Sequence, residues 1–168
     1  MANGSDYYFP ISWSDDLTYK ADQGRGDEGD VLSGGAGDDI LIGSNGGDTL
    51  DGGGDADTLE GGAGADTIDG GAGVDTASYE HSKAGVTVDL SAGTASGGDA
   101  AGDTLTGIES VTGSNYNDIL TGGADAGVLS GGNGHDDLTA GSASDMLIGG
   151  WGAGLALGGH NHGCAFII

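Results

Sequence analysis

The chain has 168 residues, of which 40 are glycine, one is proline and 27 are acidic, against three lysines and arginines. Its formal net charge of −24 excludes nucleic acid and anionic membrane surfaces as partners, because both would repel it. Collagen is also excluded, since its triple helix needs glycine at every third residue and much proline. A chain this acidic and poor in large apolar residues cannot alone offset the entropy of ordering. We therefore expect positive charge from outside the chain to complete the fold.

The ends of the sequence bear on compartment. Cys164 is the one cysteine, so an internal disulfide is excluded. The first residues, MANGSDYYFPISW, have neither the basic nor the apolar region of a cleaved signal peptide. No stretch approaches the ~18 apolar residues of a membrane span. Residues 1–24 hold most of the aromatic side chains, and we interpret them as an N-terminal cap or linker, with a partner-binding patch as the alternative.

Residues 25–78 form the first of two repeat blocks and have a period of nine residues. From Gly34 the units read GGAGDDILI, GSNGGDTLD, GGGDADTLE, GGAGADTID and GGAGVDTAS, and residues 25–33 fit the same frame. A short fixed period of this kind is typical of a solenoid. Position 6 is always aspartate and position 8 is always apolar: Asp30, Asp39, Asp48, Asp57, Asp66 and Asp75, and Leu32, Leu41, Leu50, Leu59, Ile68 and Ala77.

Each unit predicts one strand and one turn. Positions 7 to 9 alternate as a short strand with a single apolar residue facing inward. Positions 1 to 5 are rich in glycine, which adopts positive φ at little cost, so we expect them to turn the chain. Two nonapeptides then make one coil, and each unit stacks on the unit 18 residues later. This stacking aligns Asp30, Asp48 and Asp66 on one edge and the other three aspartates on the opposite edge.

The rest of the chain divides into three segments. Residues 79–112 interrupt the period, and we expect irregular coils of the same solenoid, because 34 residues are too few for an independent core. Residues 149–168 are degenerate repeats and a C-terminal tail. Residues 113–148 are the second repeat block, in a shifted frame, with Asp118, Gly127, Asp136 and Asp145 at position 6.

The rows of aspartates predict sites for a divalent cation. Calcium is a hard cation that takes six to eight oxygen ligands at about 2.3–2.6 Å. Glycine-rich turns offer backbone carbonyl oxygens and the aspartates add charged ones, and coils about 4.8 Å apart bring two such sets within reach of one ion. Without cations the stacked carboxylates repel each other. We therefore expect several Ca²⁺ ions to hold the coils together.

The unit G-G-x-G-x-D-x-U-x, in which U is apolar, resembles the nonapeptide of the RTX calcium-binding family over residues 25–148. The segment 79–112 resembles the irregular stretch of serralysin-type C-terminal domains. The resemblance implies an all-β, right-handed parallel β-roll, a β-helix solenoid with two nonapeptides per coil. It also implies a secreted, extracellular protein that folds on binding Ca²⁺. Such proteins leave through type I secretion machinery without a cleaved N-terminal signal peptide.

The resemblance further implies which residues bind calcium. In the family pattern, one turn supplies the carbonyls of positions 2 and 4 and its aspartate, and the turn 18 residues later supplies the carbonyls of positions 1 and 3 and its aspartate. The first block then holds four ligand sets: Gly26, Glu28, Asp30, Gly43, Asn45, Asp48; Ser44, Gly46, Asp48, Gly61, Ala63, Asp66; Gly35, Gly37, Asp39, Gly52, Gly54, Asp57; and Gly53, Asp55, Asp57, Gly70, Ala72, Asp75. The second block holds one complete set: Ser114, Tyr116, Asp118, Gly131, Asn133 and Asp136.

A sixth set, around Asp145, is incomplete. It has Gly123, Asp125, Ala140 and Ser142 in the carbonyl positions, but Gly127 replaces one of its two aspartates. Other departures fall at position 4, where the family usually has glycine and this chain has Glu28, Asp55, Tyr116 and Asp125.

Catalytic motifs do not occur in the sequence. There is no HExxH, no GxSxG and no GxxxxGK[ST], and the histidines are His81, His135, His160 and His162. We therefore expect a non-catalytic protein. Two alternatives stay open: the detached C-terminal region of a secreted protease, lipase or alginate epimerase, and a module of an adhesin or surface layer.

Overall fold

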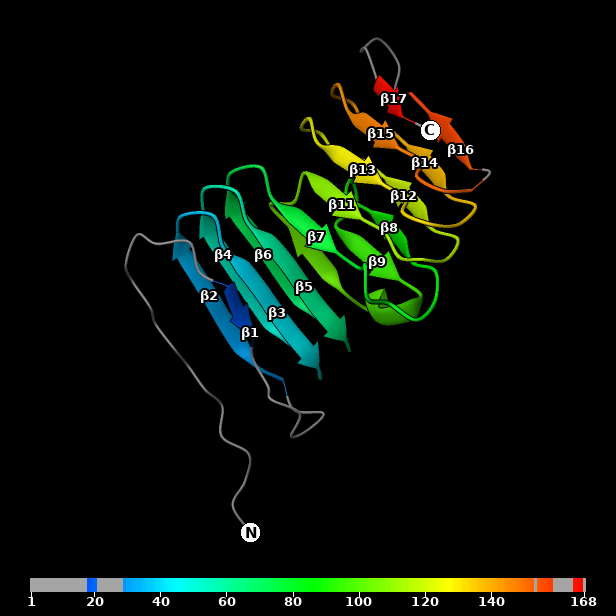
Figure 1. The fold of residues 1–168 in the computed structure, drawn as a ribbon. Helices are drawn as coiled ribbons and strands as arrows, with labels where there is room; N and C mark the ends of the chain where they lie inside the picture. Colours follow the sequence, from blue (N-terminus) through cyan, green and yellow to red (C-terminus); the bar gives the residue numbers. More distant parts are fainter. Residues whose placement is uncertain (1–17, 21–28, 153, 159–164, 168) are drawn as a thin grey trace.

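The fold is seen in a computed structural model, which describes residues 18–20, 29–152, 154–158 and 165–167. Figure 1 shows two sheets lying one over the other, with the chain passing between them. In the described residues, one sheet has the order β1-β3-β5-β7-β11-β13-β15-β17 and the other the order β16-β14-β12-β8-β9-β10-β6-β4-β2. Most neighbouring strands are parallel, with successive strands of one sheet 18 residues apart within each block. The predicted all-β parallel roll with two nonapeptides per coil is confirmed.

The strands of the first sheet are β1 (Thr18–Lys20), β3 (Ile40–Asn45), β5 (Thr58–Ala63), β7 (Thr76–Ser78), β11 (Ser110–Thr112), β13 (Val128–Ser130), β15 (Met146–Ile148) and β17 (Ala165–Ile167). The strands of the second sheet are β2 (Val31–Ala36), β4 (Thr49–Gly54), β6 (Thr67–Ala72), β8 (Thr87–Asp89), β9 (Thr94–Ser96), β10 (Thr104–Thr106), β12 (Ile119–Thr121), β14 (Asp137–Thr139) and β16 (Leu155–Leu157). A short 3-10 helix, η1, covers Gly98–Ala100.

The core is two rows of apolar side chains, one on each sheet. Register places the position-8 residue of each unit beside the equivalent residue of the next coil, as with Leu50 beside Ile68. All of these side chains in the first block are buried. Since each nonapeptide contributes a single apolar side chain, the first block has a thin core, and its coils depend on what happens at their turns.

The strands of the first block are longer than the sequence pattern predicts. β2 to β6 each cover six residues, because positions 1 to 3 of the following unit continue the strand. Position 2 nevertheless has positive φ, which is 104° at Gly53. At this glycine a Cβ atom would also collide with the carbonyl oxygen of Gly35 in the preceding coil. Glycine is therefore needed here both for conformation and for close stacking.

Residues 79–112 add strands β8 to β11 to the same two sheets. In the second sheet β9 runs antiparallel to both of its neighbours, β8 and β10, and this reversal is not predicted by the sequence pattern. β10 continues the first block beside β6, whereas β8 begins the second block beside β12. Figure 1 shows this green segment between the blue-cyan coils and the yellow-red coils.

The last coils keep the roll's geometry after the aspartate is lost. β14 pairs with β16 in parallel, and Trp151 forms a β-bridge with Asn133. Most of residues 1–24, and with it most of the predicted cap, lies outside the described part of the chain. Within the described part, no helix has the length and apolar character to cross a membrane.

The close stacking at Gly53 generates a testable prediction. Gly53→Ala should lower the unfolding free energy of the calcium-loaded roll by at least ~2 kcal/mol, because it adds a strained positive φ and a backbone collision. Gly54→Ala is the matched control. Its Cβ would lie 3.8 Å from the nearest atom, and the stacked positions in the adjacent coils, Ala36 and Ala72, already hold alanine. Denaturant unfolding measures both variants, and equal losses of stability would contradict the stacking argument.

Candidate metal centre

The position-6 aspartates lie immediately before the strands and form two ladders of carboxylates. Asp39, Asp48, Asp57, Asp66 and Asp75 are all at most 1% exposed. Their Oδ1 atoms accept hydrogen bonds from the backbone of the preceding coil: the Asp30 N–H donates to Asp48 at 2.7 Å, and the N–H groups of Asp39, Asp48 and Asp57 donate at 2.8 Å to Asp57, Asp66 and Asp75. The predicted stacking on two opposite edges is thus observed.

The second carboxylate oxygen, Oδ2, is buried against the glycine at position 1 of the same unit. A Cβ atom at Gly52 or Gly61 would collide with Oδ2 of Asp57 or Asp66, which explains why position 1 is glycine. These two oxygens have no hydrogen-bond partner among the described residues, and neither do Oδ2 of Asp75 and Asp136.

Buried oxygens of this kind fit a bound cation. An ionised carboxylate is costly to bury unless a positive charge or hydrogen-bond donors offset it. Lys83, the only lysine or arginine whose side chain the structure describes, is exposed. A hard cation such as Ca²⁺ would supply the missing charge, and oxygen is the ligand atom that it prefers.

The electrostatics of the ladders reflect this cost. Burial raises the pKa of Asp57 to about 6 and that of Asp66 to about 7, in each case partly opposed by the hydrogen bond from the backbone N–H group of the preceding coil. Neighbouring ladder carboxylates raise both values further. Burial also raises the pKa of Asp75 and of Asp136. In the absence of a cation, folding therefore favours the protonated form of these carboxyl groups.

The turns beside the ladders repeat one backbone conformation through the first block. Positive φ occurs at positions 2 and 4, including two residues other than glycine, Ser44 (92°) and Asp55 (76°). Asp55 thus adopts the conformation that glycine usually supplies at position 4. The same alternation returns at Gly132 and Gly134 and again at Gly150 and Gly152. Ser114 and Tyr116, predicted to be carbonyl ligands, do not have positive φ, so their turn has a different shape.

The structure brings most of the predicted ligands to the turns between stacked coils. In the first block these are the turns on both edges, although Gly26 and Glu28 of the first set lie outside the described residues. In the second block Asp118 and Asp136 belong to adjacent coils, joined by a hydrogen bond from the Asp118 N–H to Asp136 Oδ1 at 3.0 Å. Asp145 stacks beside Gly127, whose N–H donates to its Oδ1 at 3.0 Å.

Two ladder residues were missed in the sequence. The Asp66 N–H donates to Asp103 Oδ1 at 2.9 Å, and the Asp75 N–H donates to Glu109 Oε2 at 2.9 Å. Asp103 and Glu109 therefore continue the two ladders through the irregular segment. The signal was present as GDTL at residues 102–105, which matches positions 5 to 8 of a nonapeptide. It was hidden because the partners are 37 and 34 residues apart instead of 18.

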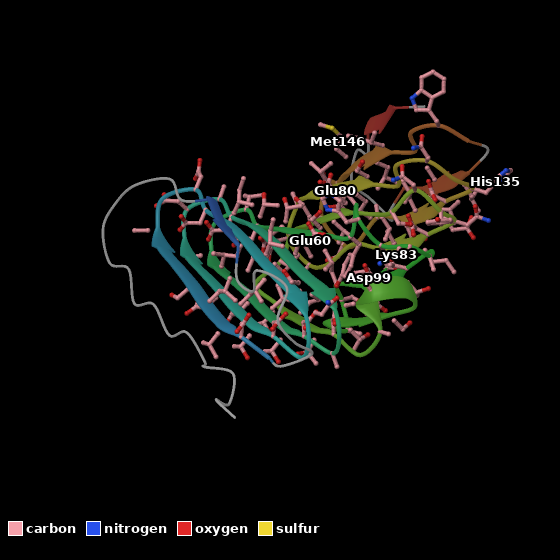
Figure 2. All side chains as sticks on the ribbon, turned by 60° about the horizontal axis from the view of Figure 1, so that its bottom comes forward. Glu60, Glu80, Lys83, Asp99, His135 and Met146 are labelled. Carbon is pink, nitrogen blue, oxygen red and sulfur yellow. The ribbon has the colours of Figure 1, made fainter. Side chains whose placement is uncertain are left out.

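A separate group of possible ligands lies on the surface. In the described residues, Glu60, Glu80 and His81 have ligand atoms within 4.8 Å of one another, and Figure 2 shows the two glutamates on the same part of the roll. His81 Nδ1 lies 2.9 Å from Glu60 Oε1, but the side chains of His81 and Glu80 are 68% and 59% exposed. Glu60 and His81 thus form a hydrogen-bonded pair at the surface, in which the Glu60 side chain is 14% exposed. His135 points away from the roll in Figure 2 and is exposed.

The raised pKa values generate a prediction about pH. In metal-depleted buffer, β-structure should increase as the pH is lowered from about 7.5 to about 5, because the folded chain binds protons that the unfolded chain, with an aspartate pKa of 3.8, releases. The stabilising contribution is complete below the unfolded value of 3.8 and is lost as the pH rises through about 6 for Asp57 and about 7 for Asp66. Far-UV circular dichroism measures it, and a β signal that weakens on acidification would contradict it.

Comparison with known proteins agrees with the geometry. The family model for the RTX calcium-binding nonapeptide repeat matches the chain in four copies, over residues 25–59, 42–77, 103–138 and 124–155. Together these copies span more than half of the chain: they cover residues 25–77 of the first repeat block, residues 103–112 of the irregular segment and the whole second repeat block. A search of curated proteins found no match. The chain therefore belongs to the family of proteins built from RTX calcium-binding nonapeptide repeats.

Proposed function

We propose that this protein is a non-catalytic, secreted module whose coils assemble when Ca²⁺ binds between them. One observation carries the proposal: the Oδ2 atoms of Asp57, Asp66 and Asp75 are buried without a hydrogen-bond partner in the part of the chain that the structure describes. A Ca²⁺ ion bound between two coils would neutralise the aspartate carboxylates there, and the carbonyl oxygens of the adjoining turns would coordinate it. Calcium binding would then supply folding free energy, as in other metal-dependent folds.

Each structural group has a definite part in this process. The Oδ1 atom of a ladder aspartate holds the backbone of the preceding coil, whereas Oδ2 is left for the ion. Glycine at position 1 makes room for the carboxylate beside the backbone. The position-8 side chains close the core once the coils are stacked. Folding of the first block thus depends on ion binding, because one apolar side chain per nonapeptide leaves the core thin.

The compartment follows from the same dependence. Extracellular calcium modules bind with dissociation constants of roughly 10⁻⁴–10⁻³ M, so in a calcium-poor cytosol the coils that need calcium would stay unfolded. The net charge of −24 would keep them extended there. An extended chain suits export through type I secretion machinery, the route that the family resemblance implies, and the higher calcium concentration outside the cell would then fold it.

Far-UV circular dichroism of the purified chain tests the central step. In EGTA we expect little β signal at neutral pH, and a cooperative rise as Ca²⁺ is added up to the millimolar range. Equal concentrations of Mg²⁺ are the control, since Mg²⁺ is smaller and gives up its hydration water reluctantly. If calcium produced no β signal at millimolar concentration, the proposed function would be wrong.

Substitution of the ladder tests the ligand assignment. Asp57 belongs to two ligand sets, so Asp57→Asn should remove about two ions from the calcium stoichiometry measured by isothermal titration calorimetry. Asp69→Asn is the matched control, because Asp69 lies on the exposed face of β6 and its substitution changes the net charge equally. An unchanged stoichiometry in Asp57→Asn would refute the assignment even if the chain still folds with calcium.

A further inference from the structure

Asp103, Asp118 and Asp145 differ from Asp57, Asp66, Asp75 and Asp136 in what contacts Oδ2. The Tyr79 hydroxyl donates to Oδ2 of Asp103 at 3.0 Å. The Ser114 N–H donates to Oδ2 of Asp118 at 2.7 Å, and the Ser114 hydroxyl donates to Oδ1 of the same residue at 2.8 Å. In Asp145, Oδ2 accepts a hydrogen bond from the Gly141 N–H at 2.7 Å. We call the contact between a ladder aspartate and the coil before it a step. At these three steps a donor from the protein takes the position that is open at Asp57 and Asp66.

The two classes of step are otherwise alike. Asp103, Asp118 and Asp145 are at most 3% exposed, as the first-block aspartates are. Their Oδ1 atoms also accept a backbone N–H group from the preceding coil, from Asp66, Val86 and Gly127 respectively. The division therefore does not arise from burial or register. It arises from whether a donor within the protein reaches Oδ2.

The division coincides with the predicted ligand sets. The unpartnered Oδ2 atoms of Asp57, Asp66, Asp75 and Asp136 fall at steps with a complete calcium ligand set. The repeat pattern supplies no set for the step between Asp66 and Asp103 or for the step between Val86 and Asp118, although Asp118 also belongs to the complete set of the next step, with Asp136. Asp145 closes the step whose set is incomplete at Gly127. Two independent features, hydrogen bonding and the repeat pattern, thus assign the same steps to the two classes.

We propose that Tyr79 and Ser114 replace the cation at the two steps of the joint, residues 79–121, so that the joint closes without calcium. The calcium-dependent coils then assemble on it from both sides. This inference rests on the proposed function for those coils, but not for the joint itself. Tyr79 and Ser114 are positioning residues at these steps, because their donors act through the ladder carboxylates; the carbonyl of Ser114 belongs to the predicted ligand set of the following step, between Asp118 and Asp136.

The core of the joint supports folding without metal. The described residues include nineteen buried apolar ones, and residues 79–111 hold eight of them: Tyr79, Val86, Val88, Ala95, Ala100, Leu105, Ile108 and Val111. The first block has one per nonapeptide. The loop before β8 is also tied to η1, since the buried Ser82 hydroxyl accepts the Asp99 N–H at 3.0 Å and donates to the Ala84 carbonyl at 2.8 Å. Apolar burial and internal donors are thus concentrated in one segment.

Hydrogen exchange of the full chain, read by mass spectrometry, tests the inference. In EGTA, amides of residues 79–121 should exchange at least about tenfold more slowly than those of residues 34–72, and calcium should slow the latter segment. Uniformly fast exchange in EGTA, with calcium binding intact, would overturn the calcium-independent joint and leave the proposed function standing. Slow exchange in the joint of a chain that binds no calcium would instead overturn the proposed function alone.

Variants test the role of the tyrosine hydroxyl. Tyr79→Phe removes the donor and leaves a buried charge on Asp103, so the slow exchange of the joint in EGTA should be lost while calcium stoichiometry is not reduced. Thr87→Val is the matched control, because Thr87 lies on the exposed face of β8 within the joint and its substitution also removes one hydroxyl group. Since Tyr79→Phe could simply unfold, the double variant Tyr79→Phe, Asp103→Asn removes the charge as well and should restore slow exchange. Unchanged exchange in Tyr79→Phe, reduced stoichiometry, or failure of the double variant to restore exchange would each overturn the proposal.

Discussion

The structure depends on burying a row of carboxylates at the spacing of adjacent coils. Each ladder aspartate uses Oδ1 to hold the backbone of the coil before it, and this places Oδ2 inside the roll. The position-1 glycines, the positive φ values and the thin apolar rows all follow from that arrangement. Something must offset the buried charge of a roll built in this way, and we propose that a cation does so in the first block.

The joint shows a second solution to the same electrostatic problem. Asp103 and Asp118 occupy equivalent ladder positions, but hydroxyl and amide donors of Tyr79 and Ser114 reach their second oxygens. β9 runs antiparallel to β8 and β10, and these three strands link the two blocks within the second sheet. They also add apolar side chains to its core. Among the described residues, the ladder through Asp66 and Asp103 thus contains both an Oδ2 atom without a donor and one that accepts a hydrogen bond from the protein.

Much of this architecture could be predicted from the sequence, because a strict period fixes register. The nonapeptide predicted the position-8 core and the stacking of Asp30 on Asp48 and of Asp48 on Asp66, and all are observed. Asp103 and Glu109 were missed because an antiparallel strand and long loops separate them in sequence from their ladder neighbours. The altered turn at Ser114 was also missed, since it depends on the hydrogen bonds of a single side chain and not on the period.

A crystal structure of the chain grown with calcium, with anomalous diffraction to identify the ions, would test the central claim most directly. The account predicts ions with oxygen ligands at about 2.3–2.6 Å, among them carboxylate oxygens of Asp57, Asp66 and Asp75. It predicts no ion between the coils of Asp66 and Asp103, where the Tyr79 hydroxyl donates instead. A roll in which the Oδ2 atoms of Asp57, Asp66 and Asp75 contact only water or protein, with no ion between the coils, would contradict it.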